Sequence, residues 1–206
     1  STSGSNIGRA DYESHGFAER RNKTYGESHD EERLMYRNLT NGATNGVYNV
    51  KNLATALERQ KAFAAALFTI PGPKMLWQFG ELGFDLSINR CANGTVNNNC
   101  RTDPKPSAFS TTLNYYNDPQ RKAVYDTWAK IINLRVNNEV FNTKTVQIDS
   151  PNDLMPKIYI WNDALPSTSL KNVVVLANFT LSSQNIIPNF PYTGTWYNLM
   201  DNSTLN

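Results

Sequence analysis

Residues 24–36, TYGESHDEERLMY, decide how the rest of the sequence is interpreted. Residues 24–29 are expected to form a short strand that ends at a charged turn, and residues 31–37 are expected to be helical. The turn contains His29, one of only 2 histidines, next to Asp30 and among acidic and basic side chains. Two interpretations stay open from these residues alone: a solvated, charged helix start, or a substrate-binding turn at the end of a strand.

The segment that follows completes a strand–helix–strand unit. Residues 50–68 include LATALERQKAFAAALF, an Ala- and Leu-rich pattern that predicts a helix. Pro71, Gly72 and Pro73 end it, and KMLWQF at residues 74–79 has the length and apolar content of a strand. Because strand, helix and strand in this order are typical of a parallel sheet, the first part of the chain is expected to be α/β.

Both cysteines lie in residues 84–117, a long polar stretch that is expected to form a functional loop. Cys91 and Cys100 enclose ANGTVNNN, which is rich in turn-forming residues. Two cysteines that close a short polar loop predict a disulfide and an oxidising compartment. The alternative is a pair of free thiols in a cytosolic protein.

A further helix and a β-rich region complete the chain. Asp118 and Pro119 predict a helix start, as N-cap and first helical residue. The apolar residues that follow at helical spacing, which are expected to face a core, are Val124, Trp128, Ile131, Ile132 and Val136. Residues 143–206 contain short runs such as KIYIWND and NVVVLANFT, which predict an antiparallel β-sandwich. The sandwich could be truncated, because no closing strand is obvious.

Composition and charge argue against several classes of partner. The formal net charge is +2 and Lys and Arg form no cluster, so no nucleic-acid partner is expected. No apolar run has the length of a membrane span, and the polar opening STSGSNIGRA lacks the features of a signal peptide. Since the sequence does not begin with Met, the chain is expected to be part of a longer gene product.

The motif at residues 25–33 resembles the fourth conserved region of the α-amylase superfamily of glycoside hydrolases (family thirteen). In that family an apolar strand is followed by Asn-His-Asp-x-x-Arg. His29, Asp30 and Arg33 match this pattern in type and spacing, and Ser28 stands where the family usually has Asn. The substitution removes an amide and leaves the His-Asp pair intact.

A second stretch, TIPGPKMLWQFGELG at residues 69–83, resembles the eighth barrel strand of that family and the loop after it. Glu81 matches the Glu of the family's Gly-x-Glu-x-Gly, whereas Pro73 and Gly80 are each displaced by one position. A β domain after the last barrel helix is a third agreement. The resemblance covers nearly the whole chain.

The resemblance implies a fold and a role for each matching residue. It implies an incomplete (β/α)8 barrel, its last two strands and helices in residues 1–142, followed by the C-terminal β domain. Asp30 would be the catalytic transition-state stabiliser and would bind ring hydroxyls, and His29 would contact the same sugar. Arg33 and Glu81 would orient the loops.

The resemblance also implies that the activity depends on a longer protein. In the family, the nucleophile and the general acid/base lie upstream of the His-Asp motif, so this fragment alone is expected to be inactive. The whole enzyme would act on α-glucosidic bonds of starch- or glycogen-like glucans by a retaining mechanism. The motif does not separate hydrolysis from transfer or branching.

Two alternatives concern the β domain, which could bind glucan by itself or serve only as a structural cover. Trp161, Trp196 and Tyr197 could stack on sugar rings, although we favour core packing for them.

Several further expectations concern ligands and location. No cofactor is expected; calcium is implied only by the resemblance, and no ligand cluster places it. The expected partners are an α-glucan oligosaccharide or polysaccharide and, because two barrel strands leave open edges, the upstream half of the enzyme or a second copy of the chain. The expected location is extracellular, periplasmic or on the cell surface of a bacterium, with any signal upstream.

Overall fold

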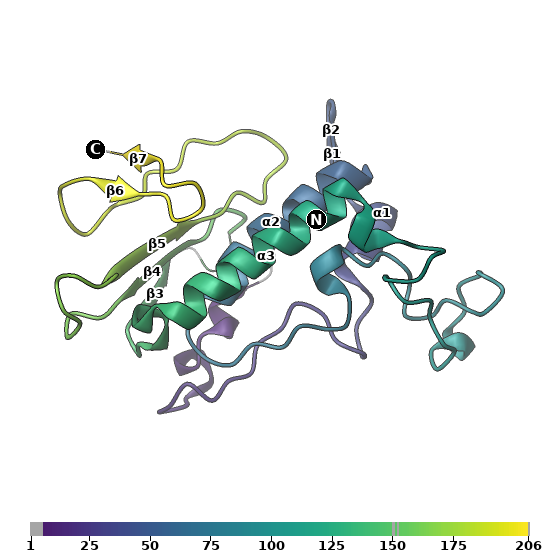
Figure 1. Ribbon diagram of the computed structural model, residues 1–206, viewed down its shortest axis with the longest axis horizontal. Helices are drawn as coiled ribbons and strands as arrows, with labels where there is room; N and C mark the ends of the chain where they lie inside the picture. Colours follow the sequence, from purple (N-terminus) through teal and green to yellow (C-terminus); the bar gives the residue numbers. More distant parts are fainter. Residues whose placement is uncertain (1–5, 150, 152, 206) are drawn as a thin grey trace.

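The structure, a computed structural model, describes residues 6–149, 151 and 153–205. Residues 1–5, where the predicted polar opening begins, lie outside this set, as do residues 150, 152 and 206. The described chain has a mixed α/β fold, in which two long helices lie beside a small antiparallel sheet (Figure 1).

Two helices, α2 (Leu53–Thr69) and α3 (Pro119–Asn137), run side by side through the middle of the molecule (Figure 1). The side chains of Asn52 and Asp118 each accept a hydrogen bond from a backbone N–H in the first helical turn. Both predicted helices are therefore confirmed, with a later start for the first. The aromatic rings of Phe68 and Trp128 join them edge to face, with centroids 5.0 Å apart.

The predicted inward face of α3 is largely confirmed. Val124, Trp128 and Ile131 are buried, and Ile132 packs partly buried against the same cluster. The prediction is wrong for Val136, which is 73% exposed. At 100° per residue it lies about 140° away from Ile131 around the helix, so it points to solvent.

Shorter elements surround these helices. Helix α1 (Leu34–Asn41) starts later than predicted, because the backbone at Arg33 is still extended. A small hairpin follows, in which β1 (Thr44–Asn45) pairs with β2 (Tyr48–Asn49). Six 3-10 turns occur among the described residues: η1 (Ile7–Ala10), η2 (Glu13–His15), η3 (Gly80–Leu82), η4 (Asn98–Cys100), η5 (Tyr115–Asn117) and η6 (Glu139–Asn142).

The two strands predicted at residues 24–29 and 74–79 are reduced to one parallel bridge between Thr24 and Lys74. The Thr24 N–H donates to the Pro73 carbonyl (3.1 Å), and the Met75 N–H donates to the Thr24 carbonyl (3.0 Å). The parallel direction is as predicted, but the strands themselves are not. A two-stranded parallel pair has little stability, and no third strand flanks it in the part of the chain that the structure describes.

The C-terminal region contains a three-stranded antiparallel sheet in the order β3 (Val146–Asp149), β4 (Lys157–Trp161), β5 (Asn172–Leu176). A separate small hairpin pairs β6 (Trp196–Tyr197) with β7 (Thr204–Leu205). The antiparallel β-rich prediction is confirmed. Among the described residues neither a closed barrel nor a two-sheet sandwich is seen, since the apolar face of the three-stranded sheet packs on helices.

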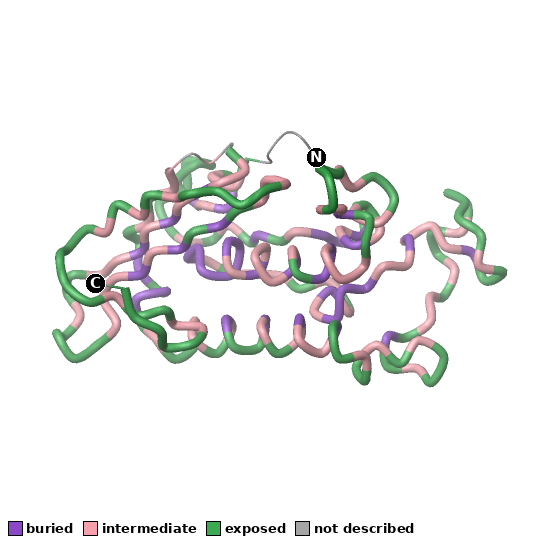
Figure 2. Tube along the Cα trace, turned by 90° about the horizontal axis from the view of Figure 1, so that it is seen from above, coloured by how far each residue is buried: buried purple, intermediate pink, exposed green. Residues whose placement is uncertain are grey.

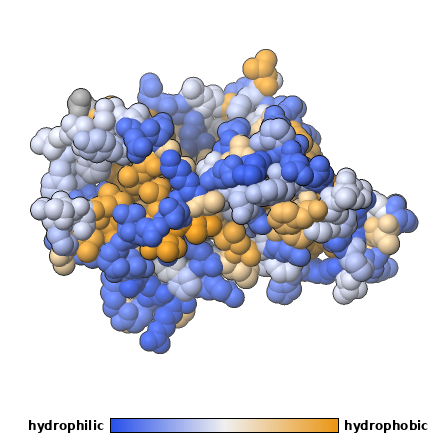
Figure 3. Space-filling model, viewed as in Figure 1, coloured by the Kyte–Doolittle hydropathy of each residue, from blue (hydrophilic) through white to orange (hydrophobic). Residues whose placement is uncertain are grey.

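One apolar cluster joins the sheet to the helices. Ile158 and Ile160 alternate with outward residues on β4 and are buried against the helical part, as are Val173 and Val175 on β5. Figure 2 shows buried residues along the helices and strands and exposed residues in the surrounding loops. In the space-filling view, polar surface surrounds an apolar area on the sheet side (Figure 3). The boundary near residue 142 stays a prediction.

No helix within the described residues is both long enough and apolar enough to cross a membrane.

Candidate active site

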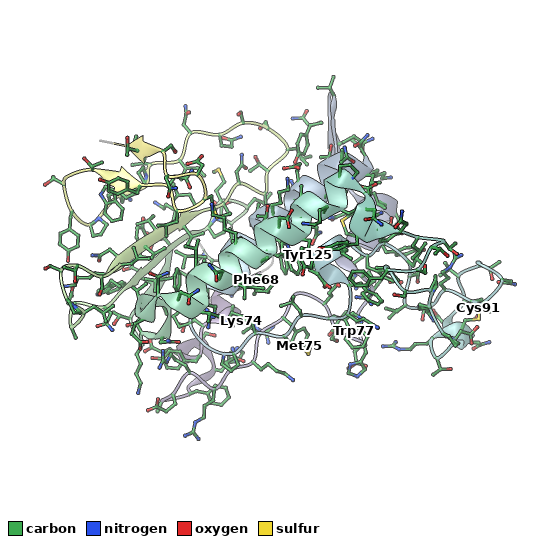
Figure 4. All side chains as sticks on the ribbon, viewed as in Figure 1. Phe68, Lys74, Met75, Trp77, Cys91 and Tyr125 are labelled. Carbon is green, nitrogen blue, oxygen red and sulfur yellow. A yellow bond between two sulfur atoms is a disulfide. The ribbon has the colours of Figure 1, made fainter. Side chains whose placement is uncertain are left out.

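The parallel bridge brings two turns together. Because Thr24 pairs with Lys74 in parallel, the turns that follow each residue lie at the same end of the pair. The first turn carries the predicted His29 and Asp30. The second begins at Trp77, which lies between Lys74 and the disulfide loop in Figure 4.

His29 and Asp30 are adjacent and open to solvent. Each side chain is 69% exposed, and His29 Nε2 lies 3.3 Å from Asp30 Oδ2. Arg101 Nη2 donates to the His29 carbonyl (2.7 Å) and approaches Asp30 Oδ1 (3.4 Å). The Trp77 ring faces the imidazole, with centroids 5.8 Å apart. Arg101 and Trp77, which come from two other parts of the chain, therefore lie next to the predicted His29–Asp30 pair.

The third predicted residue, Arg33, is buried. Its Nη1 donates to Glu27 Oε1 (2.9 Å) and to the Gln78 carbonyl (2.8 Å). The other Glu27 oxygen, Oε2, accepts the Leu34 N–H at 2.8 Å. Since the Arg33 and Glu27 side chains are only 5% and 10% exposed, this ion pair is shielded from solvent. One guanidinium therefore connects the two turns and the start of α1.

Burial sets the electrostatics of this pair. Burial raises the pKa of the Glu27 carboxyl, while the Leu34 N–H and the Arg33 charge act in the opposite direction. Burial also raises the pKa of Glu81 in η3, and its own backbone N–H and the Arg33 charge oppose this shift. The positive charge of Arg33 therefore acts on the Glu81 carboxyl. The loop-orienting role of Glu81 stays a prediction.

Further hydrogen bonds hold the motif in an extended turn. Ser28 Oγ accepts the Asp30 N–H (3.0 Å), and it also donates to the Glu31 carboxylate. Glu32 accepts hydrogen bonds from Ser87 Oγ (2.5 Å) and from the Ile88 N–H (2.9 Å). Because α1 begins only at Leu34, His29 and Asp30 do not belong to a helix start. The charged-helix interpretation is therefore wrong for this pair.

A cavity of about 240 Å³ lies beside the imidazole. Its lining includes His29, Arg33, Trp77 and Arg101, and Asp30 is outside it. Arg33 Nε and Trp77 Nε1 are buried N–H groups without a hydrogen-bond partner among the described residues. Since buried donors in proteins are normally paired, these two N–H groups are exceptions beside the cavity.

The predicted disulfide between Cys91 and Cys100 is confirmed, with an S–S distance of 2.12 Å. Among the residues described, Cys91, Cys100 and Asp103 form the one group with metal-ligand spacing. Both sulfurs are in the disulfide, so neither is the thiolate that a metal binds best. Arg101 directly follows Cys100, so the cross-linked loop carries the cation that reaches His29.

Sequence reasoning missed Arg101. Arg101 contacts a residue 72 positions away, and nothing local in its polar loop marks it. Glu27 had a local indication, because it lies 6 positions before the arginine with which it pairs.

Comparison with known proteins finds a weak structural similarity and no sequence match. No family model matches the sequence, and no curated protein matches it. Among solved structures, a trehalose-6-phosphate hydrolase from Bacillus licheniformis is similar, with a TM-score of 0.41 and 13% identity over 77% of this chain. The chain spans 42% of the length of that protein. A TM-score this low does not establish a shared fold.

Proposed function

We propose that this chain is the C-terminal part of an α-amylase-type glycoside hydrolase that acts on α-glucosidic bonds of starch- or glycogen-like glucans. In this proposal Asp30 stabilises the transition state, and His29 binds the same sugar. Arg33 and Glu81 orient the surrounding loops. The nucleophile and the general acid/base belong to an upstream part of the protein.

The observation that carries this proposal is the exposed His29–Asp30 pair in a turn whose other end is fixed by the buried Arg33–Glu27 pair, with the Trp77 ring next to both His29 and Arg33. A carboxylate that must bind a sugar needs an open face and a fixed backbone. Asp30 has the open face, and its N–H is held by Ser28 Oγ at 3.0 Å. Such preorganisation favours interactions that strengthen as charge develops in the transition state.

The chemistry expected at this position is electrostatic. A retaining glycosidase passes through an oxocarbenium-like transition state, and hydrogen bonds to ring hydroxyls strengthen as it forms. The Asp30 carboxylate can accept two such hydrogen bonds. The neighbouring imidazole can donate or accept one more, and Arg101 limits the rotation of Asp30 through its 3.4 Å contact.

The experiment compares two variants of the longer protein that contains this chain. Asp30→Asn removes the charge and keeps the shape, and release of reducing sugar from soluble starch is expected to fall by about 10²–10³-fold. Asp126→Asn is the matched control: Asp126 is an exposed carboxylate on α3 that pairs with Lys122. Its activity is expected to equal that of the parent.

The result that would remove Asp30 from the mechanism is an equal rate for Asp30→Asn and the control. An inactive parent protein, tested on both starch and glycogen, would contradict the proposed activity itself. Product analysis of an active parent then separates hydrolysis, which releases reducing ends, from transfer, which conserves their number.

A further inference from the structure

We propose that the outer face of the three-stranded sheet carries a second binding site, a cleft for a neutral oligosaccharide, at a distance from the His29–Asp30 pair. The class of sugar, an α-glucan, rests on the proposed function; the cleft itself rests on the sheet.

The strand register shows which side chains of β4 form the floor of this cleft. Ile158 and Ile160 of β4 face the helices and are buried, so Tyr159 and Trp161 face outward. Tyr159 is paired with Gln147 on β3, and Trp161 is paired with Asn172 on β5. Two aromatic rings, two residues apart on one strand, therefore share a face with Gln147 and Asn172 and with Val174, the β5 partner of Tyr159.

The segment at residues 187–192 crosses this face and forms a wall. Tyr159 Oη donates to the Pro188 carbonyl (2.8 Å), and Lys157 Nζ approaches the Ile187 carbonyl (3.5 Å). Between these anchors and the sheet lies a cleft of about 320 Å³. This volume is within the range of small-molecule sites in proteins.

Stacked aromatic rings support the far end of that wall. Phe190 stacks on Trp196 with centroids 4.4 Å apart and an interplanar angle of 13°. Trp196 Nε1 donates to the Tyr192 carbonyl at 3.1 Å. The Tyr192 side chain lines the cleft and is 55% exposed, so it provides an accessible ring at the rim.

The residues that line the cleft indicate the class of ligand that it would bind. The aromatic residues in its lining are Tyr159, Trp161 and Tyr192, and the polar ones are Gln147, Asp149, Asn172 and Asn189. Aromatic faces suit the apolar faces of sugar rings, while amides and a carboxylate suit hydroxyl groups. The amide of Asn172 makes no side-chain hydrogen bond to any residue in the described ranges, and it is available to a ligand.

Charge complementarity narrows the choice further. Asp149 is the one charged side chain in the lining, and it accepts a hydrogen bond from Gln147 Nε2 at 2.8 Å. Lys157, the cross-strand partner of Asp149, lies at the edge of the cleft, so the two charges offset each other and leave no net charge that would attract phosphorylated or acidic ligands. A neutral, polyhydroxylated ring is the class that matches both the rings and the charge.

The position of the aromatic residues corrects an expectation from the sequence. Trp161 was expected in the core, yet it lies half-buried on the face opposite to Ile160. Tyr197, expected there as well, is 65% exposed. Trp196 is half-buried through its stack on Phe190, outside the main apolar cluster.

The test is native gel electrophoresis of the 206-residue chain through gels that contain one polysaccharide each. The probes are soluble starch, hydroxyethyl cellulose as a neutral β-glucan, and carboxymethyl cellulose as an acidic one. Retardation by starch is expected, with none by the acidic polymer. In Trp161→Ala and in Tyr192→Ala the dissociation constant for starch is expected to rise at least about tenfold.

Two controls keep the outcomes separate. Tyr197→Ala removes an exposed aromatic ring outside the cleft and is expected to leave retardation unchanged. Asp30→Asn is also expected to leave it unchanged, because it acts at the other site. Tyr192→Ala alters an exposed rim residue, so it tests the cleft even if Trp161→Ala is unfolded by circular dichroism.

The proposal is overturned if no neutral polysaccharide retards the chain, if only the acidic one does, or if Tyr192→Ala binds like the parent. Retardation by hydroxyethyl cellulose alone, lost in Tyr192→Ala, would support the cleft and count against the starch-like substrate. Binding of starch by a chain whose longer protein has no glycosidase activity would likewise support the cleft alone.

Discussion

Replacement of Arg33 by methionine tests whether the buried ion pair holds the two turns of the candidate site together. The variant keeps the apolar stem of the side chain and removes the charged guanidinium group. It leaves the Glu27 carboxylate, 10% exposed, without its cation, and the Gln78 carbonyl without its donor. Removal of one partner of a buried ion pair costs about 3–5 kcal/mol. We expect the free energy of unfolding at pH 7 to fall by this amount.

The loss is expected to depend on pH. Burial already raises the pKa of Glu27 above its ordinary value of 4.5, and Arg33 opposes that shift, so its removal raises the pKa further. A carboxyl with a raised pKa in the folded state destabilises the fold as pH rises above the unfolded value. The difference between Arg33→Met and the parent should therefore be small near pH 4.5 and grow toward neutral pH.

The assay is urea denaturation followed by tryptophan fluorescence at pH 4.5 and pH 7.5. Lys61→Met is the matched control, because Lys61 pairs with Glu58, whose side chain is 67% exposed, and its loss should cost at most about 1 kcal/mol. Adding Glu27→Gln to Arg33→Met should recover part of the stability. A loss for Arg33→Met that is equal at both pH values would refute the role assigned to the Glu27 charge.

Two further predictions concern single residues. A Cβ on Gly83, whose φ is +60°, would lie 2.4 Å from Leu57 Cδ2, so Gly83→Ala should cost about 1–3 kcal/mol in a thermal melt. Gly46→Ala has a similar φ of +57° and open space, so an equal loss there would contradict the packing argument. Burial lowers the pKa of Lys74 to about 7, against 10.5 for an ordinary lysine. Because the unfolded chain then binds more protons between these values, stability should rise from pH 7 to pH 9.5 in the parent and not in Lys74→Met, by urea denaturation.

Elements that depend on local patterns were predictable from the sequence. The start of α3 follows from Asp118 and Pro119, which cap the helix and fit its first turn. The disulfide follows from a pair of cysteines that closes a short polar loop. The strand predicted at residues 74–79 fails for the opposite reason: a parallel strand is stabilised by its neighbours, and its own residues do not specify them. Only the bridge at Lys74 remains.

In the candidate site, too, some residues could be predicted from local sequence and others could not. His29, Asp30 and Arg33 were singled out because their types and spacing resemble a family motif whose residues lie close together in the chain. Two contacts could not be predicted, because each joins segments that are far apart in the chain. They are the contact of Arg101 with the His29 carbonyl and the contact of Arg33 with the Gln78 carbonyl.

The sequence by itself determined the N-terminal cap of α3 and the disulfide, both of which depend on residues close together in the chain. Only the tertiary structure decided which side chains surround the His29–Asp30 pair. It also decided that Trp161 lies in an outer cleft and not in the core. The physical reason is that contacts between distant segments depend on how whole helices and sheets pack, and such contacts leave no periodic pattern in the sequence.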